Sequence, residues 1–486
     1  MNKTAKTILA ACLALGLATP AMAEFKLNGY YRLMGYNSEV RSDAAANILT
    51  GTGNAAFTDN QADEEGESRQ FIDQRLRLKA TYTLNDNVAV VWFGEIDTIW
   101  GTAGGALGAD NVNVETKNAY LDLKSGDTSA ILGVQGIADS YQGVLYNDDM
   151  AGVSATHKIG NTTLNLVYAK LWEDNRSDDD DADLYSVGVK QKISDTVKLG
   201  ADLFYMDIND AQNVYDTTVA SYLPAAITGF QPNANPIPWN DQVAAEAWAI
   251  GVNADATFGN FNVNGFAIYE DLSVEFDRTA ALFANAVYGD DNVDGSAWLA
   301  TAKGTMKIDG GDVGLRVLYI SPNDDSDAAD QWIGNLGEYE FPGENLMQFM
   351  VDAYVCNYGK ESYAWQDSVD QGYGLLAFVA SGNHKLPSDM YLKWGAGYFL
   401  AADDEAKGST GIYGDNNEFV GDTRGGGDTL GYELAVRFGK KYFEKVDVSV
   451  NASYAGYGDF YDNTARGVNN DPDSTYKTYL MLNVPF

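Results

Sequence analysis

The sequence predicts an all-β fold, a transmembrane antiparallel β-barrel of about sixteen to eighteen strands. Three observations predict it. Apolar and polar side chains alternate in one segment after another along the whole chain. The connections between these segments alternate between short and long. The last segment, 476–486, keeps the alternation up to an aromatic Phe486.

The alternation is clearest in residues 70–84. One face of this segment is apolar and consists of Ile72, Leu76, Leu78, Ala80, Tyr82 and Leu84. The other face is polar and consists of Asp73, Arg75, Arg77, Lys79, Thr81 and Thr83. Segments 88–98, 390–400 and 429–438 repeat the pattern. A period of two indicates strands, because a helix would distribute these residues around its axis.

The connections differ in chemistry as well as in length. The short ones are rich in Gly, Asn, Asp and Ser, as hairpin turns are, and lie at 85–87, 125–127, 160–161, 194–196, 259–260 and 309–311. The long ones lie near 37–69, 100–113, 136–149, 173–183, 207–244, 271–294, 321–370, 401–428 and 458–473. Short periplasmic turns and long extracellular loops are typical of transmembrane barrels.

The strand count depends on residues 346–358, which also alternate. Single-chain bacterial barrels have even strand numbers. Assigning this segment to a long excursion within 321–370 gives about eighteen strands, and sixteen stays open. Proline supports the strand assignment, because none of the 10 prolines falls inside an expected strand except Pro485.

The N-terminal segment has the pattern of a secretory signal. Lys3 and Lys6 precede an uncharged apolar run over 8–18, and Ala21-Met22-Ala23 provides a cleavage pattern before Glu24. A lipoprotein pattern also ends at Cys12, but this residue falls inside the apolar run. We therefore expect residues 1–23 to be removed and 24–486 to form a single barrel domain.

Charge and cysteine content exclude several kinds of partner and site. Removal of residues 1–23, with two lysines and no acid, changes the formal net charge from −37 to −39. This excess argues against nucleic acid as a partner. With Cys356 and two His left, neither a disulfide nor a thiol–imidazole metal site can form. No later run approaches the ~20 apolar residues of a membrane helix, but barrel strands escape such scans.

If the apolar faces meet lipid, the polar faces line a lumen. The cations expected there are Arg32, Arg75, Arg77, Lys79, Lys190, Lys192, Arg316, Lys393 and Arg437. Arg75, Arg77 and Lys79 are successive inward residues of one strand and would form a ladder with steps of about 7 Å.

Two interpretations of this ladder stay open. It could set the electric field of a pore, with Arg32 extending it from the neighbouring strand. Alternatively, Glu95, Asp97 and Asp122 on the following strands could neutralise it.

Clustered carboxylates on the long loops are candidate ligands for Ca²⁺. The densest run is Asp178, Asp179, Asp180 and Asp181. Carboxylates bind hard cations, which could bridge them to lipopolysaccharide. A solvated outer loop explains the run equally simply, and we favour that interpretation. The sequence indicates no other cofactor.

The histidines do not indicate an enzyme. His157 lies near a short turn, and His384 lies within the turn 383–385. Neither is placed as a general base, and the Gly-x-Ser-x-Gly pattern of serine hydrolases is absent.

Two stretches carry a resemblance to known families. The terminal strand resembles the closing strand of bacterial outer-membrane barrels. Residues 93–136 resemble the homotrimeric outer-membrane porins of sulfate-reducing bacteria, and they contain FGEIDTIWG at 93–101, GGALGAD at 104–110, KNAY at 117–120 and GVQG at 133–136. QRLRL at 74–78 fits the same pattern. The likeness extends over about residues 24–170.

This resemblance implies a bacterial outer-membrane location, contact with lipid and lipopolysaccharide, and a trimer of water-filled barrels. General porins oppose a basic ladder with acids on an inward-folded third loop. The resemblance therefore implies a constriction at 136–150, with Asp139, Asp148 and Asp149. The four prolines of 207–244 depart from a minimal porin and leave the pore width open.

The function expected from this reasoning is passive diffusion of small hydrophilic solutes. One alternative is a substrate-specific porin for sugars or carboxylates, with Tyr30, Tyr120 and Tyr391 as a stacking track. The other is a plugged, adhesive surface barrel. Ion preference is not decided, since the ladder favours anions, and the larger acidic excess favours cations.

Overall fold

The computed structural model describes residues 24–40, 67–101, 114–173, 181–208, 243–276, 292–322, 336–337, 346–347, 368–369, 373–403, 427–461 and 474–486. The predicted signal segment, 1–23, lies outside the described residues. Within these ranges, no helix has the length and apolar character needed to cross a membrane.

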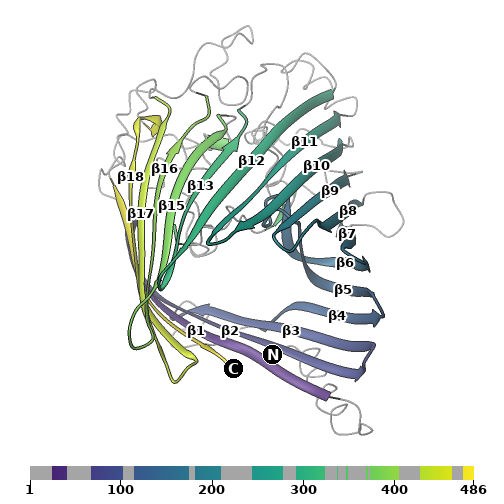
Figure 1. Ribbon diagram of the computed structural model, residues 1–486, viewed down its shortest axis with the longest axis horizontal. Coiled ribbons are helices and arrows are strands. Elements are labelled where there is room, and N and C mark those ends of the chain that lie inside the picture. The colour runs from purple at the N-terminus through teal and green to yellow at the C-terminus, as the bar shows by residue number, and fades with distance from the viewer. Residues whose placement is uncertain are drawn as a thin grey trace.

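The described residues form one antiparallel sheet that closes on itself (Figure 1). Its strands are β1 (Glu24–Val40), β2 (Glu67–Asn85), β3 (Val88–Ile99), β4 (Glu115–Ser125), β5 (Thr128–Ala138), β6 (Tyr146–Ile159), β7 (Thr162–Trp172), β8 (Ala182–Lys192), β9 (Val197–Ile208), β10 (Val243–Phe258), β11 (Phe261–Phe276), β12 (Asn292–Ile308), β13 (Gly311–Ile320), β14 (Leu336–Gly337), β15 (Leu375–Lys385), β16 (Met390–Leu400), β17 (Thr429–Tyr442), β18 (Val446–Tyr457) and β19 (Thr475–Pro485).

The barrel wall has 18 strands within the described ranges. The sheet counts 19, but the two-residue β14 pairs in parallel with β6 and stands apart from the wall. β13 pairs directly with β15, so the chain between them is an excursion, as expected for 321–370. Residues 348–358, whose strand assignment was open, lie outside the described residues. The predicted fold class and its upper strand number are confirmed.

The seam between β1 and β19 closes the barrel. Register partners run from Tyr30 opposite Pro485 to Glu39 opposite Tyr476. Gly29 and Phe486 also exchange both backbone hydrogen bonds, at 3.0 and 2.9 Å. The alternating terminal segment is therefore a full member of the wall.

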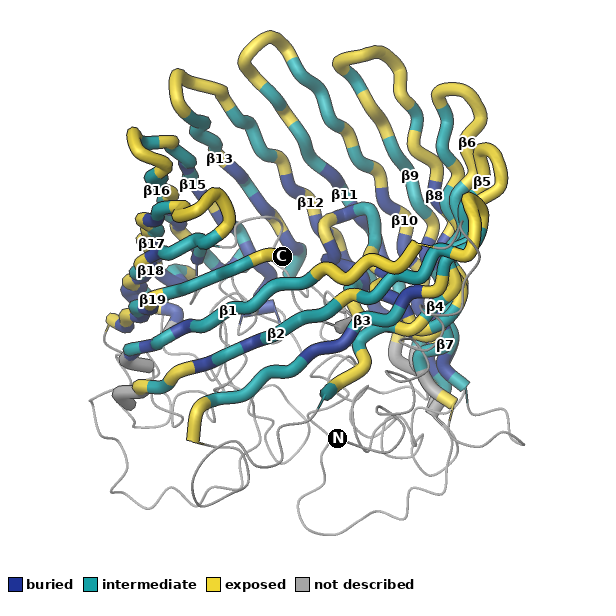
Figure 2. Tube along the Cα trace, turned by 90° about the horizontal axis from the view of Figure 1, so that it is seen from below, coloured by how far each residue is buried: buried dark blue, intermediate teal, exposed yellow. Residues whose placement is uncertain are grey.

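Tight turns occupy one rim of the barrel, and Figure 2 shows a row of them as exposed loops. Gly126, Gly160, Gly259 and Gly310 have positive φ in these turns, a conformation that glycine adopts without a Cβ penalty. The longer connections leave from the opposite rim.

The two faces of the wall differ as the alternation predicts. Exposed apolar side chains such as Val187, Leu203 and Ile250 point outward. Their neighbours along the strands point inward, and Ala247 and Ala249 there are at most 3% exposed. The outer face is thus apolar and uncovered, whereas much of the inner face is covered by other parts of the chain.

An aromatic belt surrounds part of the outer face near the rim with the long connections. Each strand from β7 to β13 and from β15 to β19 contributes one residue to it. These are Tyr168, Tyr185, Tyr205, Trp248, Tyr269, Trp298, Tyr319, Phe378, Tyr398, Tyr432, Tyr454 and Tyr476. Such girdles mark the boundary between hydrocarbon and headgroups in transmembrane barrels.

Candidate functional site

The connection between β5 and β6 is organised by one carboxylate. Asp139 accepts hydrogen bonds from the backbone N–H groups of Tyr141, Gly143, Leu145 and Tyr146, at 2.5 to 3.1 Å. Burial raises the pKa of Asp139, and these four donors act in the opposite direction by stabilising the charged form. The carboxylate therefore holds the loop together, a structural use of a residue predicted to face solutes.

This inward loop, residues 139–145, lies inside the barrel. Ser140 Oγ and Tyr141 Oη donate to the Asp202 carboxylate on β9, at 3.2 and 2.8 Å. Arg316 Nη2 on β13 donates to Gln142 Oε1 at 3.5 Å. A loop between β5 and β6 can reach both strands only through the interior. Burial and the Asp202 charge raise the pKa of Tyr141, so its hydroxyl keeps the proton that it donates.

A second segment enters the interior from the excursion between β13 and β15. β14 pairs with β6 through Leu336 opposite Tyr146, directly after the inward loop. Met347 is fully buried, and its Cε lies only 3.3 and 3.0 Å from where a Cβ would stand at Gly395 and Gly397 on β16. These two glycines therefore make room for Met347 against the inner wall.

The predicted basic ladder on β2 lies directly opposite acids on β3. The register places Arg75 opposite Asp97 and Arg77 opposite Glu95. Arg75 Nη2 lies 3.0 Å from Asp97 Oδ2, and its Nε lies 3.4 Å from Glu95 Oε2. Arg77 is also ion-paired with Glu95. Of the two interpretations of the ladder, this geometry fits the neutralised wall.

The same pairing extends to β1, where Arg32 Nη2 lies 3.5 Å from Asp73 Oδ2. Lys79, the last member of the ladder, is exposed. The paired cluster formed by Arg32, Asp73, Arg75, Arg77, Glu95 and Asp97 thus carries three positive and three negative groups.

The other predicted pore residues occupy separate places. Lys393 on β16 faces Arg437 on β17 in register, and Arg437 bonds to Asn451 and, at 3.0 Å, to the Tyr479 hydroxyl. Asp149 is ion-paired with Lys117 at 2.8 Å.

Of the remaining predicted acids, Asp148 is exposed at the start of β6. Asp181 is ion-paired with Lys170 at 2.5 Å. Asp178, Asp179 and Asp180 lie outside the described residues. Among the residues with described positions, no group of three or more His, Cys, Asp and Glu could hold a metal.

The aromatic and histidine candidates also have local partners. Tyr391 donates to both oxygens of Asp447, at 2.8 and 3.0 Å, and the Tyr30 ring lies 5.9 Å from the Arg77 guanidinium. His384 Nε2 accepts from Trp394 at 3.1 Å. Of the two remaining candidates, Tyr120 lies on β4. The exposed His157 has its Nδ1 2.9 Å from the Thr128 hydroxyl.

A second group of polar residues, most of them cations, faces the lumen on β8–β13. One residue from each strand stands opposite the next in the hydrogen-bonding register. We call this set the basic row: Lys192, Lys198, Asp255, Asn264, Lys303 and Arg316.

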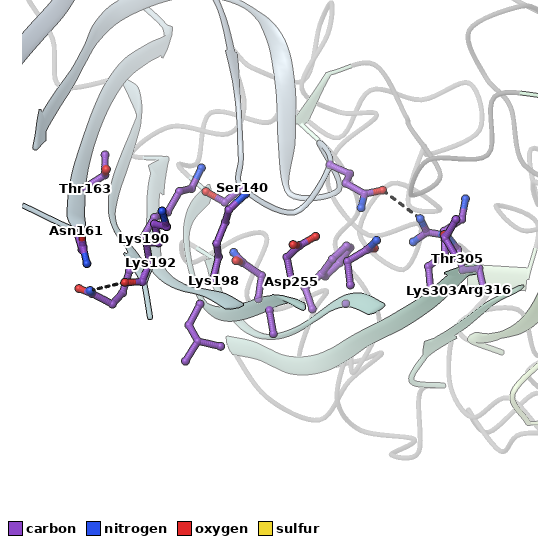
Figure 3. A pocket seen from close by; sticks show the side chains of 18 residues that line it. Ser140, Asn161, Thr163, Lys190, Lys192, Lys198, Asp255, Lys303, Thr305 and Arg316 are labelled. Atoms are coloured by element: carbon purple, nitrogen blue, oxygen red, sulfur yellow. Dashed lines mark hydrogen bonds between the residues drawn. The ribbon is translucent and has the colours of Figure 1, made fainter. Parts of the chain in front are cut away.

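The basic row and the inward loop line one cavity of about 650 Å³. In Figure 3, Lys190 and Lys192 lie at one side, Lys303 and Arg316 at the other, and Ser140 and Asp255 between them. The sequence placed Lys190, Lys192 and Arg316 on the lumen face one by one. It did not reveal the row, because the register between strands sets which residues meet.

Comparison with known proteins shows the fold. No protein-family model and no curated protein matches this sequence. Among solved structures, OccK9 (OpdG) of Pseudomonas aeruginosa is similar with a TM-score of 0.52 and 10% identity, over 95% of this chain and 99% of that chain.

Two further Pseudomonas aeruginosa structures are similar to the same extent. OpdQ has a TM-score of 0.52 and 10% identity, over 95% of this chain and 97% of its own. The outer membrane protein opdK has a TM-score of 0.51 and 10% identity, over 95% and 98%. The general porin-like architecture implied by the sequence resemblance fits these structures.

Proposed function

We propose that this chain is a bacterial outer-membrane porin through which small hydrophilic solutes and ions diffuse passively. Its apolar outer face contacts lipid, and the rim with the long connections lies next to lipopolysaccharide. It is not an enzyme and needs no cofactor.

One observation carries this proposal: a closed wall is apolar outside and charged inside, with an open cavity beside an inward loop. Apolar patches beyond a few hundred Å² are rare on water-soluble monomers. Here every wall strand has exposed apolar side chains on its outer face, and the aromatic belt bounds them from β7 to β13 and from β15 to β19. A barrel of 18 strands has a lumen wide enough for an aqueous channel, because the barrel diameter grows with the number of strands.

Planar-bilayer recording of the purified, refolded protein tests the proposal. We expect discrete conductance steps in KCl, because the cavity on β8–β13 is lined by charged and polar side chains. A correctly folded barrel without conductance would contradict it. That result would instead support a plugged, adhesive barrel. In such a barrel the segments around β14 and Met347, which lie against the inner wall, would contribute to the plug.

The assembly in this proposal is a homotrimer with β1–β6 at the subunit interface. The aromatic belt stops at β7, and most outward positions of the remaining sector near the same rim are small or polar, with Ile72 and Trp100 as exposed apolar exceptions. They include Gly35 and Asn37 on β1, Gln70 on β2, Gly136 on β5 and Ala151 on β6. A lipid-facing wall would continue the belt, so another subunit would cover this sector. The resemblance of residues 93–136 to homotrimeric porins supports the same assembly.

Native mass spectrometry of matched alanine-to-tryptophan variants tests the trimer. Ala151→Trp places a large side chain in the proposed interface, and we expect it to release monomers. Ala302→Trp, also outward but within the belt sector on β12, should leave the trimer intact. A monomeric wild type, or equal behaviour of the two variants, would contradict this assembly.

A substrate-specific porin is the second candidate, and the basic row favours it. Tyr391 is engaged by Asp447, so charge rather than stacking is the feature of the lumen that could select a solute.

A further inference from the structure

We infer that the basic row, together with Lys190, binds small oxyanions in the lumen and prefers dianions to monoanions. This inference rests on the proposed function, because solutes reach the row only through an open channel. It assigns the ion preference to a wall different from the predicted ladder on β2.

The register brings like charges together at both ends of the row. Lys192 stands directly opposite Lys198, and Lys303 stands directly opposite Arg316. Directly opposed residues have Cβ atoms about 5 Å apart, and like charges in such pairs are destabilising. An anion between the members of a pair relieves this repulsion, so the barrel wall itself favours anion binding.

Lys190 and Lys198 are the most available cations of the group. Both are exposed to the lumen, and within the part of the chain that the structure describes neither has an ion-pair partner. Lys192 does have one, Asp195 at 2.6 Å, but this pair is solvent-exposed and therefore weak.

The wall beside Lys190 presents a buried donor, Asn253 Nδ2. Lys190, Gly200 and Asn253 are consecutive register partners on β8, β9 and β10. A Cβ at Gly200 would lie 2.6 Å from Asn253 Oδ1, so the absence of a side chain at Gly200 makes room for the Asn253 side chain. Asn253 Nδ2 is buried and, among the described residues, has no hydrogen-bond partner. An oxyanion oxygen would provide that partner.

The charges around the cavity leave a positive excess. The cations that line the cavity are Lys190, Lys192, Lys198, Lys303 and Arg316, and among the described lining residues Asp255 is the one acid. Asp202 is not part of this lining and accepts hydrogen bonds from the Ser140 and Tyr141 hydroxyl groups. Two positive ends therefore flank a single acid, Asp255, which disfavours a lone monoanion at the centre. A dianion interacts with two cations at once and gains more than a monoanion does.

Current block in the bilayer tests this inference on the assembled protein. With KCl present, we expect micromolar-to-millimolar sulfate or succinate to interrupt the wild-type current, and equal concentrations of acetate to have little effect. Block by sulfate alone assigns the row to compact inorganic oxyanions, and block by succinate alone assigns it to dicarboxylates. Conductance without block by either dianion would overturn the inference and leave the porin function intact.

The matched variants locate the site. Lys190→Gln with Lys198→Gln removes two charge-assisted contacts, each worth about a factor of ten in affinity, so the blocking concentration should rise at least about tenfold. Lys79→Gln removes one lumen charge from β2 and should leave block unchanged. An equal loss of block in the double variant and in Lys79→Gln would overturn the assignment of the site to β8–β13. Titration calorimetry of the wild type with sulfate and with succinate needs no variant, and the absence of binding heat with both would overturn the inference as well.

Discussion

The β1–β3 wall and the β8–β13 wall use the same kinds of residue and create opposite electrostatic environments. On β1–β3, Arg32, Arg75 and Arg77 each form an ion pair with a carboxylate of β2 or β3, although Arg32 stands opposite Arg75 in the register. On β8–β13, Lys192 meets Lys198, and Lys303 meets Arg316. Both walls alternate with a period of two. The difference shows that ion pairing with nearby carboxylates, rather than the number of inward cations, determines where a lumen is positive.

The largest effect should follow from breaking the paired cluster. Glu95 is 4% exposed and is ion-paired with both Arg75 and Arg77. Glu95→Gln leaves two guanidinium groups in a buried place with one carboxylate fewer. We expect a loss of about 3 kcal/mol in the free energy of unfolding, followed by circular dichroism. Asp97→Asn is the control and should cost less, since the Asp97 side chain is 34% exposed. Equal stabilities of Glu95→Gln and wild type would contradict the structural role of these pairs.

Releasing the inward loop should change the channel without changing the wall. Asp139→Ala removes the acceptor of four backbone N–H groups, and water in the lumen can replace it once the loop is released from the wall. We expect larger and noisier conductance steps with nearly unchanged thermal unfolding of the barrel. Asp148→Ala, which removes an exposed carboxylate of β6, should behave like wild type. Unchanged conductance in Asp139→Ala would show that this loop does not narrow the channel.

A charge reversal should make the second wall resemble the first. Lys198→Glu places opposite charges in register with Lys192, as on β2 and β3. We expect the reversal potential in a KCl gradient to shift toward cation preference, and Lys198→Gln to produce roughly half of that shift, because it removes one of the two charge units. A shift of equal size for both variants would contradict an electrostatic origin.

The smallest effect is expected at Lys79, the exposed member of the predicted ladder. Lys79→Gln should change the free energy of unfolding by no more than about 0.5 kcal/mol, as exposed substitutions do. Its reversal potential should remain close to that of wild type. A large shift toward cations would show that the β2 ladder, despite its paired arginines, dominates the field.

The sequence alone predicted the fold because a barrel wall depends on local patterns. Alternation in 70–84 identified the inward face of Arg75 and Arg77, and glycine turns such as Gly160 marked the strand ends. Interstrand register is a non-local property. The sequences of β8 and β9 therefore could not predict that Lys192 stands opposite Lys198. The inner position of Tyr141 depends on Asp202, in a strand separated from it by 61 residues. No local pattern carries that contact.

The β1–β19 seam has a consequence for how the barrel forms. Thr478 Oγ1 donates to the Asn37 carbonyl across it, between residues 441 apart in the chain. Loop-closure entropy for such a separation is about 5 kcal/mol and is lost once, whereas every register pair of the seam then adds its own hydrogen bonds. Contacts of such high contact order form slowly. Until they form, β1 and β19 are two open sheet edges that can capture other chains. We therefore expect closure to be the last and most aggregation-sensitive step of folding, and the closed ring to reopen rarely.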